Sequence, residues 1–338
     1  MRYLRIAILL AIVALVGYTG YVGYEGSSQL LAVDDERGYQ TYCFTPEMYG
    51  GWDYEAVNYD IALDASLPDD TDGDGDRYDE DCGDLRGTAG DEIVTPDGIR
   101  VAGWYIPAVN QSDTTILLVH GNPANKSDML RHAAFLHDDY NLLLPDLRNS
   151  GRSSGDASTT GVLEYQEVEA ILDWLVAARA PAHIGALVES GGAAATLMAA
   201  RDDPRLEAIV SDSVHARHAT AVGEELSNTP PHPTYPGLWG IQLAFQIRTG
   251  HAMGEADPID SVAALGDRPY LILHGTEDTA NVPADSAEEL LEAATTAGVP
   301  VRLEYCEGGR HGQLTNDCPD QYGGWVTEFF EAAFGTGT

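Results

Sequence analysis

The sequence predicts an α/β domain in which helices cover both faces of a mostly parallel β-sheet. The first observation is the alternation of short apolar segments with stretches whose apolar residues have helical spacing. The apolar segments, which we predict to be strands, cover residues 114–120, 141–146, 183–188, 206–211, 269–274 and 301–305. The helical stretches include 162–178 and 284–297. Strands that alternate with helices in this way form parallel sheets with crossover helices.

Two further observations complete this architecture. Residues 92–108 have the pattern of a hairpin that turns at Asp97-Gly98. The interval of about 212–262 breaks the alternation and is rich in proline and aromatic residues. We expect it to form a small cap over the C-terminal edge of the sheet, where open α/β folds bind ligands. A packing excursion without a role in ligand binding is the alternative.

Residues 1–26 are predicted to form a transmembrane anchor. Arg2 and Arg5 precede an uncharged run over residues 6–24, which is just long enough to cross a bilayer. Acidic residues follow the run, so the basic end should stay in the cytoplasm. The rest of the chain would then lie outside the cell membrane, held by a single pass. A cleaved signal peptide, which would give a secreted protein, is the alternative, although no good Ala-x-Ala site follows the run.

The chain is strongly acidic, with 54 acidic and 18 basic residues and a net charge of −36. Such a surface repels polyanions, so nucleic acid and anionic membrane surfaces are excluded as partners. The acidity fits adaptation to high salt, where counterions screen the self-repulsion. It fits equally a genome rich in G and C, and composition does not separate the two.

Residues 27–90 are predicted to be an acidic appendage, and residues 91–338 the catalytic domain. The appendage contains a candidate structural calcium loop in which Gly75 permits a tight turn. The carboxylates with the ligand spacing of such a loop are Asp70, Asp72, Asp74, Asp76 and Asp81. The twelfth position holds Asp instead of the longer Glu, and no obvious helices flank the loop. A solvated acidic linker is therefore the alternative.

The chain has four cysteines, which permit three disulfide connectivities. We predict the pairs Cys43–Cys82 and Cys306–Cys318, because the members of each pair lie within one region of the chain and an oxidising compartment would favour disulfides. Four free thiols are the alternative.

Ser190 is the predicted nucleophile. It follows an apolar strand directly and precedes a run of small residues suited to a helix, so its hydroxyl would stand above the sheet at a helix N-terminus. Ser153 fits the Gly-x-Ser-x-Gly pattern over residues 151–155, but polar residues surround it and no helix starts there. We therefore expect Ser153 to lie in a loop beside the site.

The segment around Ser190 departs from the usual pattern, because Val188 stands where glycine is expected. A β-branched side chain would crowd the turn unless the helix lies further away, and the alanines at 193–195 leave that room. We expect a slightly widened turn with retained activity. A site that has lost its activity is the alternative.

The loops at the predicted strand ends hold a serine, an acid and a histidine in that order along the chain. Ser190 follows one strand, Asp278 follows the strand 269–274, and His311 follows the last strand. Glu277, one position before Asp278, should point away from the site. A histidine can accept the proton of the serine hydroxyl, and a carboxylate fixes the tautomer of that histidine.

With these residues the chain resembles the α/β-hydrolases of the serine-hydrolase branch that carry a His-Gly-Asn oxyanion loop. The similarity covers about residues 91–336 and includes the segments 97–98, 120–122, 145–148 and 256–260. It implies the α/β-hydrolase fold, with Ser190 as nucleophile, His311 as general base and Asp278 as the orienting acid. The resemblance also implies that the backbone N–H groups of Asn122 and Gly191 form the oxyanion hole, with His120 packed under the loop.

The expected function is therefore that of a membrane-tethered, extracytoplasmic serine hydrolase. It would cleave a small-molecule carboxylic ester, or a related acyl bond, through an acyl-enzyme and without a catalytic cofactor. An amide- or peptide-cleaving enzyme is one alternative, and a non-catalytic binding protein with the same fold is the other. His215 and His218 enter the cap with i, i+3 spacing, but no further ligand completes a metal set. Surface or substrate contacts are expected for them instead.

Overall fold

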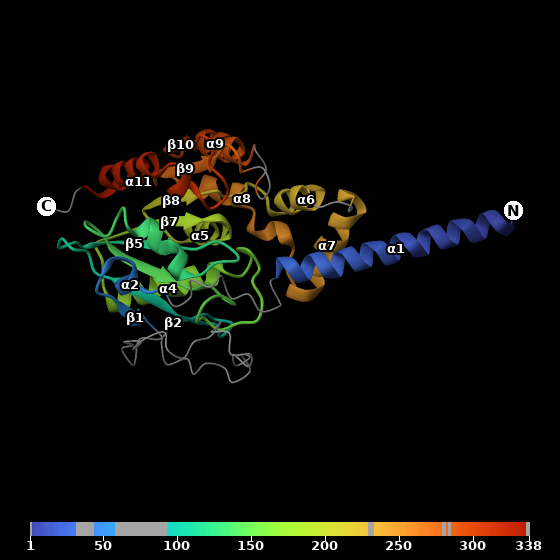
Figure 1. The fold of residues 1–338 in the computed structure, drawn as a ribbon, viewed down its shortest axis with the longest axis horizontal. Helices are drawn as coiled ribbons and strands as arrows, with labels where there is room; N and C mark the ends of the chain where they lie inside the picture. The colour runs from blue at the N-terminus through green and yellow to red at the C-terminus, as the bar shows by residue number, and fades with distance from the viewer. Residues whose placement is uncertain are drawn as a thin grey trace.

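The protein is built on one eight-stranded sheet with the strand order β1-β4-β6-β5-β7-β8-β9-β10, shown in a computed structural model (Figure 1). The structure describes residues 2–31, 44–57, 93–228, 233–278, 282 and 285–335. The strands of the sheet are β1 (Glu55–Val57), β4 (Gly103–Ile106), β5 (Thr114–Val119), β6 (Asn141–Pro145), β7 (His183–Glu189), β8 (Ala208–Asp212), β9 (Tyr270–Gly275) and β10 (Val301–Cys306). The pairs β1–β4 and β4–β6 are antiparallel and the others are parallel. A separate hairpin joins β2 (Ile93–Val94) to β3 (Arg100–Val101).

Helices cover both faces of this sheet, as predicted. The helices are α1 (Arg2–Leu30), α2 (Pro46–Gly50), α3 (Leu130–Ala133), α4 (Tyr165–Ala178), α5 (Ser190–Asp202), α6 (His218–Asn228), α7 (Thr234–Thr249), α8 (Pro258–Val262), α9 (Ser286–Ala297), α10 (Leu314–Asp317) and α11 (Pro319–Phe334). Leu117 and Val119 of β5 belong to a core cluster with α4, α5 and α9. Ile116 and Leu118 of the same strand belong to the cluster with α3 and α11. Successive side chains of a strand point to opposite faces, so β5 contributes to both cores.

The fold class and the mostly parallel sheet are confirmed. Each predicted strand agrees with an observed strand to within two residues at either end. The two observed helices α4 and α9 begin three and two residues later than predicted. The hairpin at Asp97-Gly98 is also present, as the turn between β2 and β3. Periodicity identified these elements because each of them buries at least one face.

The predicted boundary at residue 91 is wrong for the segment 44–57. Within it, β1 pairs with β4 and forms the edge of the main sheet, and Ala56 and Val57 are buried. Trp52 stacks on His137 with ring centroids 4.4 Å apart. The segment therefore belongs to the same domain as the main sheet. A three-residue edge strand is too short to show periodicity, so the sequence pattern did not reveal it.

Two predictions fall on residues outside those that the structure describes. These are the pair Cys43–Cys82 and the calcium loop of Asp70, Asp72, Asp74, Asp76 and Asp81. The second cysteine pair is confirmed, since Cys306 and Cys318 form a disulfide. It joins the end of β10 to the start of α11 and so closes the loop that carries His311.

Removal of calcium tests the loop prediction. If carboxylates 70 to 81 bind the ion, chelation should lower the melting temperature by a few degrees, because an ion bound only to the folded state stabilises it. Thermal unfolding with and without a chelator measures this, and added calcium should restore the original curve. Identical curves would favour the acidic linker.

Helix α1 is longer than the predicted anchor and does not end at residue 26. It runs without interruption to Leu30, and its N-terminal half projects from the globular part (Figure 1). The stretch Arg5–Leu30 is long and apolar enough to cross a membrane, with a mean hydropathy of 2.1. The second half packs against α7, where Val22 joins a core cluster with Leu238, Ile241 and Phe245. The cap is thus partly built from the N-terminal helix.

Lys126, the single lysine of the chain, is fully buried and forms an ion pair with the buried Asp146. Its ammonium group lies 4.7 Å from the centre of the Trp104 ring. Lys126→Met should destabilise the fold by about 3–5 kcal/mol, because it leaves the buried carboxylate without its cation. Chemical denaturation measures this loss. The double variant with Asp146→Asn should recover most of it, and an equally unstable double variant would contradict the pairing argument.

Candidate active site

The structure brings Ser190, His311 and Asp278 together at the C-terminal edge of the sheet. Nε2 of His311 lies 3.0 Å from Oγ of Ser190, and Nδ1 lies 2.8 Å from Oδ2 of Asp278. The three residues come from the start of α5, the loop after β10 and the turn after β9. Parallel strands end at one edge of the sheet, which is why segments far apart in sequence meet here.

The surroundings of His311 favour its protonated form. Burial disfavours the imidazolium form of His311, but the hydrogen bond and charge of Asp278 outweigh it and raise the pKa of His311 above its usual value. The charge of Glu189 acts in the same direction. Asp278 is 2% exposed, so its charge acts on the imidazole with little screening by water.

Ser190 occupies the sharp turn that the strand–serine–helix pattern predicted. Its φ of +49° is in the left-handed region that residues other than glycine rarely adopt. A Cβ atom on Gly192 would lie 2.2 Å from the carbonyl oxygen of His120, so only glycine lets α5 approach β5 here. Val188 is fully buried in one core cluster with Ala193 and Ala195. The valine is therefore accommodated while Ser190 keeps its contact with His311.

The loop after β5 lies against Ser190. A Cβ atom on Gly121 would be 3.0 Å from Cβ of Ser190, and one on Gly191 would be 3.8 Å from Cβ of Asn122. Gly191 is the second residue of α5, and N–H groups in a first helical turn have no partner within the helix. His120 is buried beneath this loop, where its Nε2 accepts a hydrogen bond from the backbone N–H of Leu147.

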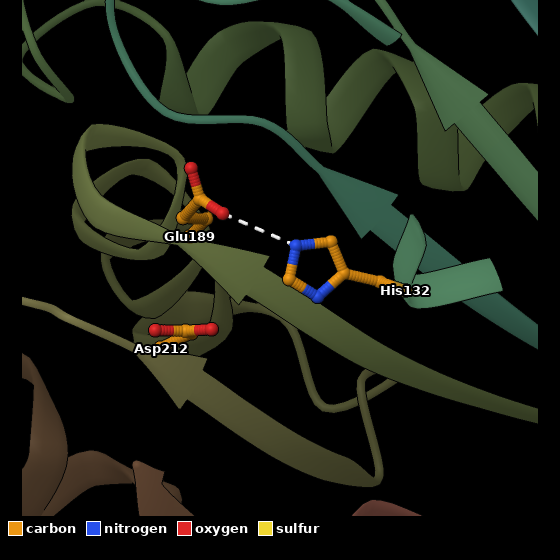
Figure 2. A group of neighbouring side chains, drawn as sticks. All are labelled: His132, Glu189 and Asp212. Carbon is orange, nitrogen blue, oxygen red and sulfur yellow. Dashed lines mark hydrogen bonds and ion pairs between the residues drawn. The ribbon is translucent and has the colours of Figure 1, made fainter. Parts of the chain in front are cut away.

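Glu189, the residue before Ser190, belongs to a buried polar network with His132 (Figure 2). Its carboxylate pairs with Arg131 and lies 3.1 Å from Nε2 of His132. The other nitrogen of His132 lies 2.8 Å from the hydroxyl of Tyr322. Burial opposes ionisation of Glu189, but the bonds to His132 and Arg131 prevail and lower its pKa to about 2. This ionisation stabilises the fold above the ordinary pKa of a glutamate, and the contribution is lost as pH falls towards 2.

His132, Glu189 and Asp212 offer donor atoms that lie within 4.8 Å of one another, a spacing compatible with a metal ion. The Arg131 guanidinium already supplies a cation to Glu189. Burial and the charge of Glu189 raise the pKa of Asp212 to about 7, which favours its neutral form. We therefore interpret the cluster as an ion-pair network that holds the turn before Ser190. Sequence reasoning missed it, because its members come from α3, β7 and β8.

Replacing Glu189 by glutamine tests this role. Loss of the ion pair should shift the turn and lower kcat by about 10²-fold, since small displacements of a catalytic group are costly. The acid limb of the pH profile should also move to lower pH, because Glu189 contributes to the raised pKa of His311. A matched control is Glu167→Gln, which disturbs the buried pair of Glu167 with Arg148. Equal pH profiles for the two variants would contradict the proposed role of Glu189.

Ser190 and His311 line a cavity of about 680 Å³. Its wall includes the cap histidines His215 and His218, which are 4% and 2% exposed. Of the two roles expected for these histidines, surface contact is wrong, because both side chains are buried in the wall of the cavity. Burial lowers the pKa of His215 to about 3 and that of His218 to about 4, so both rings are neutral near pH 7. Among the described residues, none forms a hydrogen bond with Nε2 of His215.

Ser153 and Glu277 lie where they cannot act as catalytic groups. Ser153 is fully buried, and its hydroxyl donates to the carbonyl of Asp146 at 2.7 Å and accepts from the N–H of Ala102 at 2.8 Å. Glu277 is exposed, unlike the neighbouring Asp278. Residues 151–155 thus form a loop in which Ser153 has a structural role, and their match to the nucleophile pattern is coincidental.

Comparison with known proteins agrees with this architecture. A family model described as alpha/beta hydrolase fold matches residues 114–260. The chain therefore has the α/β-hydrolase fold.

Two bacterial proteins and two archaeal structures illustrate the similarity. YfhR of Escherichia coli strain K12 is 26% identical over 65% of this chain and 72% of its own length. YqkD of Bacillus subtilis strain 168 is 24% identical over 69% of this chain and 76% of its own. An esterase of Pyrococcus furiosus superimposes with a TM-score of 0.60 at 23% identity, covering 72% of this chain and 90% of its own. The acylaminoacyl peptidase of Pyrococcus horikoshii gives 0.57 at 20% identity, covering 73% and 41%.

Proposed function

We propose that the protein is a membrane-tethered serine hydrolase that cleaves a carboxylic ester through an acyl-enzyme. The observation that carries this proposal is the continuous path from Oδ2 of Asp278 through the imidazole of His311 to Oγ of Ser190, at the wall of a cavity. Each contact is of hydrogen-bonding length, and a nucleophile, a base and an orienting acid are what acyl transfer requires.

In the proposed reaction, Oγ of Ser190 attacks the carbonyl carbon of the ester while Nε2 of His311 accepts the hydroxyl proton. Asp278 holds the other imidazole nitrogen and stabilises the imidazolium. When the C–O bond breaks, the imidazolium gives its proton to the departing alcohol and Ser190 carries the acyl group. Water then attacks this ester, His311 accepts a proton from the water and returns it to Oγ of Ser190, and the carboxylic acid leaves.

Backbone N–H groups of Asn122 and Gly191 are proposed to bind the oxyanion of each tetrahedral intermediate. Both residues adjoin Ser190, and one of them lies in the first turn of α5, whose dipole favours negative charge at this end. A donor of this kind stabilises the transition state by about 3 kcal/mol. The proposal needs no metal or organic cofactor for catalysis.

The anchor is proposed to be retained in the mature protein. Its C-terminal part is integrated into the fold, since the carbonyl of Leu31 accepts a hydrogen bond from the N–H of Ser158 and Arg248 donates to Ser27 and Ser28. Cleavage in or after α1 would remove one wall of the catalytic cavity, which includes Val22. With Arg2 and Arg5 at its cytoplasmic end, the helix would hold the catalytic domain outside the cell.

Labelling with a fluorophosphonate tests the nucleophile, and a substrate panel tests the bond. The intact protein in detergent or a nanodisc should form one covalent adduct, located at Ser190 by peptide mass spectrometry. Aryl esters of increasing acyl length should be hydrolysed faster than the matching anilides. Because an acylaminoacyl peptidase has a similar fold, faster anilide cleavage would favour the amide-cleaving alternative. A folded wild-type protein without an adduct would leave only the binding-protein alternative.

A further inference from the structure

Helix α7 of the cap is apolar on two sides. One side packs inward, where Leu238, Ile241 and Phe245 are buried. The other side exposes a stripe that consists of Tyr235, Trp239, Leu243 and Ile247, with exposed fractions of 58%, 61%, 58% and 74%. Trp239, Leu243 and Ile247 are spaced four residues apart, which places them along one edge of the helix. The backbone of Tyr235 is not helical, and its ring joins the stripe by its contact with Trp239. A helix that is apolar all round is expected in a protein core or against a membrane, and α7 is only half covered by protein.

The charge of α7 also sets it apart from the rest of the chain. Residues 234–249 contain no Asp or Glu, and Arg248 is their only charged residue, although the whole chain has a net charge of −36. The remaining large exposed apolar residues outside α1 and α7, within the described parts of the chain, are scattered singly or in small groups. An apolar stripe on a helix that itself carries no acidic residue marks an interaction surface and adds no repulsion of its own at a lipid headgroup layer.

This stripe adjoins the part of α1 where the predicted span ends. The two helices touch through their backbones, since a Cβ atom on Gly240 would lie 2.2 Å from the carbonyl oxygen of Thr19 and one on Gly23 would lie 2.5 Å from that of Gly240. Close packing through small residues is typical of helices that associate in membranes. If about the first 20 residues of α1 cross the hydrocarbon core, this crossing point lies at the outer edge of the bilayer.

Aromatic residues gather at the same level. Tyr21 and Tyr24 of α1 are 61% and 63% exposed. On α7 the rings of Tyr235 and Trp239 are in contact, with centroids 5.2 Å apart. Tyrosine and tryptophan are enriched at the boundary between lipid and water, so both helices have the composition of an interfacial zone.

We propose that α7 lies in the outer interface of the lipid bilayer, with the stripe from Tyr235 to Ile247 in contact with acyl chains. This inference rests on the proposed membrane anchor. It also defines the class of substrate, because the cavity of Ser190 is lined by Tyr21, Val22 and Leu30 of α1 and by Ile241 of α7. The cavity thus reaches from the nucleophile to the exposed Tyr21 at the level of the lipid. The substrate is then an amphiphilic ester that enters from the membrane.

Quenching of tryptophan fluorescence tests the contact with lipid. The full chain with Ser190→Ala is placed in zwitterionic nanodiscs whose lipids carry bromine at a shallow acyl position. We expect Trp239→Phe to abolish most of the quenching and the matched control Trp325→Phe, on α11, to leave it unchanged. Equal quenching in the Trp239→Phe variant would overturn the proposal, as would a Trp239 protected by a second copy of the chain. Because the Ser190→Ala chain is expected to be inactive, the quenching result does not depend on catalysis. Fluorophosphonate labelling tests the proposed catalytic function separately.

Kinetics test the substrate class. Leu243→Glu with Ile247→Glu should lower the hydrolysis of a long-chain ester embedded in the nanodisc by about tenfold, equivalent to 1.4 kcal/mol. Hydrolysis of a short, water-soluble ester should not change. The control is Val109→Glu, which introduces a charge at an exposed valine that is not on the cap. An equal loss for both esters, or no loss for either, would overturn the inferred entry from the membrane.

Discussion

Replacing Ser190 by alanine should lower kcat on an ester by a factor on the order of 10⁵ to 10⁶, with a much smaller change in KM. The variant keeps the cavity and the proposed oxyanion donors but loses the atom that forms the acyl-enzyme. Fluorophosphonate labelling should disappear as well. Steady-state kinetics and labelling of the same preparation measure both effects, and circular dichroism shows whether the variant is folded.

Ser153→Ala is the decisive control for that experiment, because Ser153 fits the usual nucleophile pattern better than Ser190 does. Removing its hydroxyl breaks two buried hydrogen bonds and should cost about 1–3 kcal/mol of stability. Labelling and kcat should stay within a few-fold of wild type below the melting temperature. If labelling were lost in Ser153→Ala and kept in Ser190→Ala, the assignment of the nucleophile would be wrong.

Asp278→Asn should lower kcat by about 10⁴-fold, because an amide no longer favours the imidazole tautomer that accepts the serine proton. The pH profile carries a second signature. Asp278 raises the pKa of His311, and the base must be neutral to act, so wild-type activity rises as pH increases through this raised pKa. In the variant the acid limb should move to lower pH. A profile of kcat/KM against pH for both proteins measures the shift.

The exposed neighbour of Asp278 supplies a matched control. Glu277→Gln removes one carboxylate from the same turn, yet its side chain points to solvent, so kcat and the acid limb should be unchanged. An acid limb that moved equally in both variants would assign the effect to the general acidity of the loop. In that case Asp278 would not be the orienting acid.

The comparison of Ser153 with Ser190 shows how much a sequence pattern can predict about the nucleophile. The segment around Ser153 matches the three specified residues of a five-residue pattern, whereas Ser190 has the structural context of a strand, a turn and a helix. The second match is physically more informative, because a nucleophile needs an exposed hydroxyl beside a helix N-terminus. Val188 stands where the sequence pattern has glycine, but the turn at Ser190 keeps its geometry, since the alanines of α5 leave room for the valine in the core.

The fold class, the order of strands and helices in the central domain and the candidate set of Ser190, His311 and Asp278 could all be predicted from the sequence. These properties are encoded locally, in hydrophobic periodicity and in residues that follow directly after strands. Three further features became visible in the folded chain alone: residues 44–57 supply an edge strand, Glu189 pairs with Arg131, and His215 is buried in the cavity wall. The tertiary structure also placed the second half of α1 against α7. These contacts join segments far apart along the chain, and no local pattern specifies which distant partner a short strand, a charge or an apolar helix will meet.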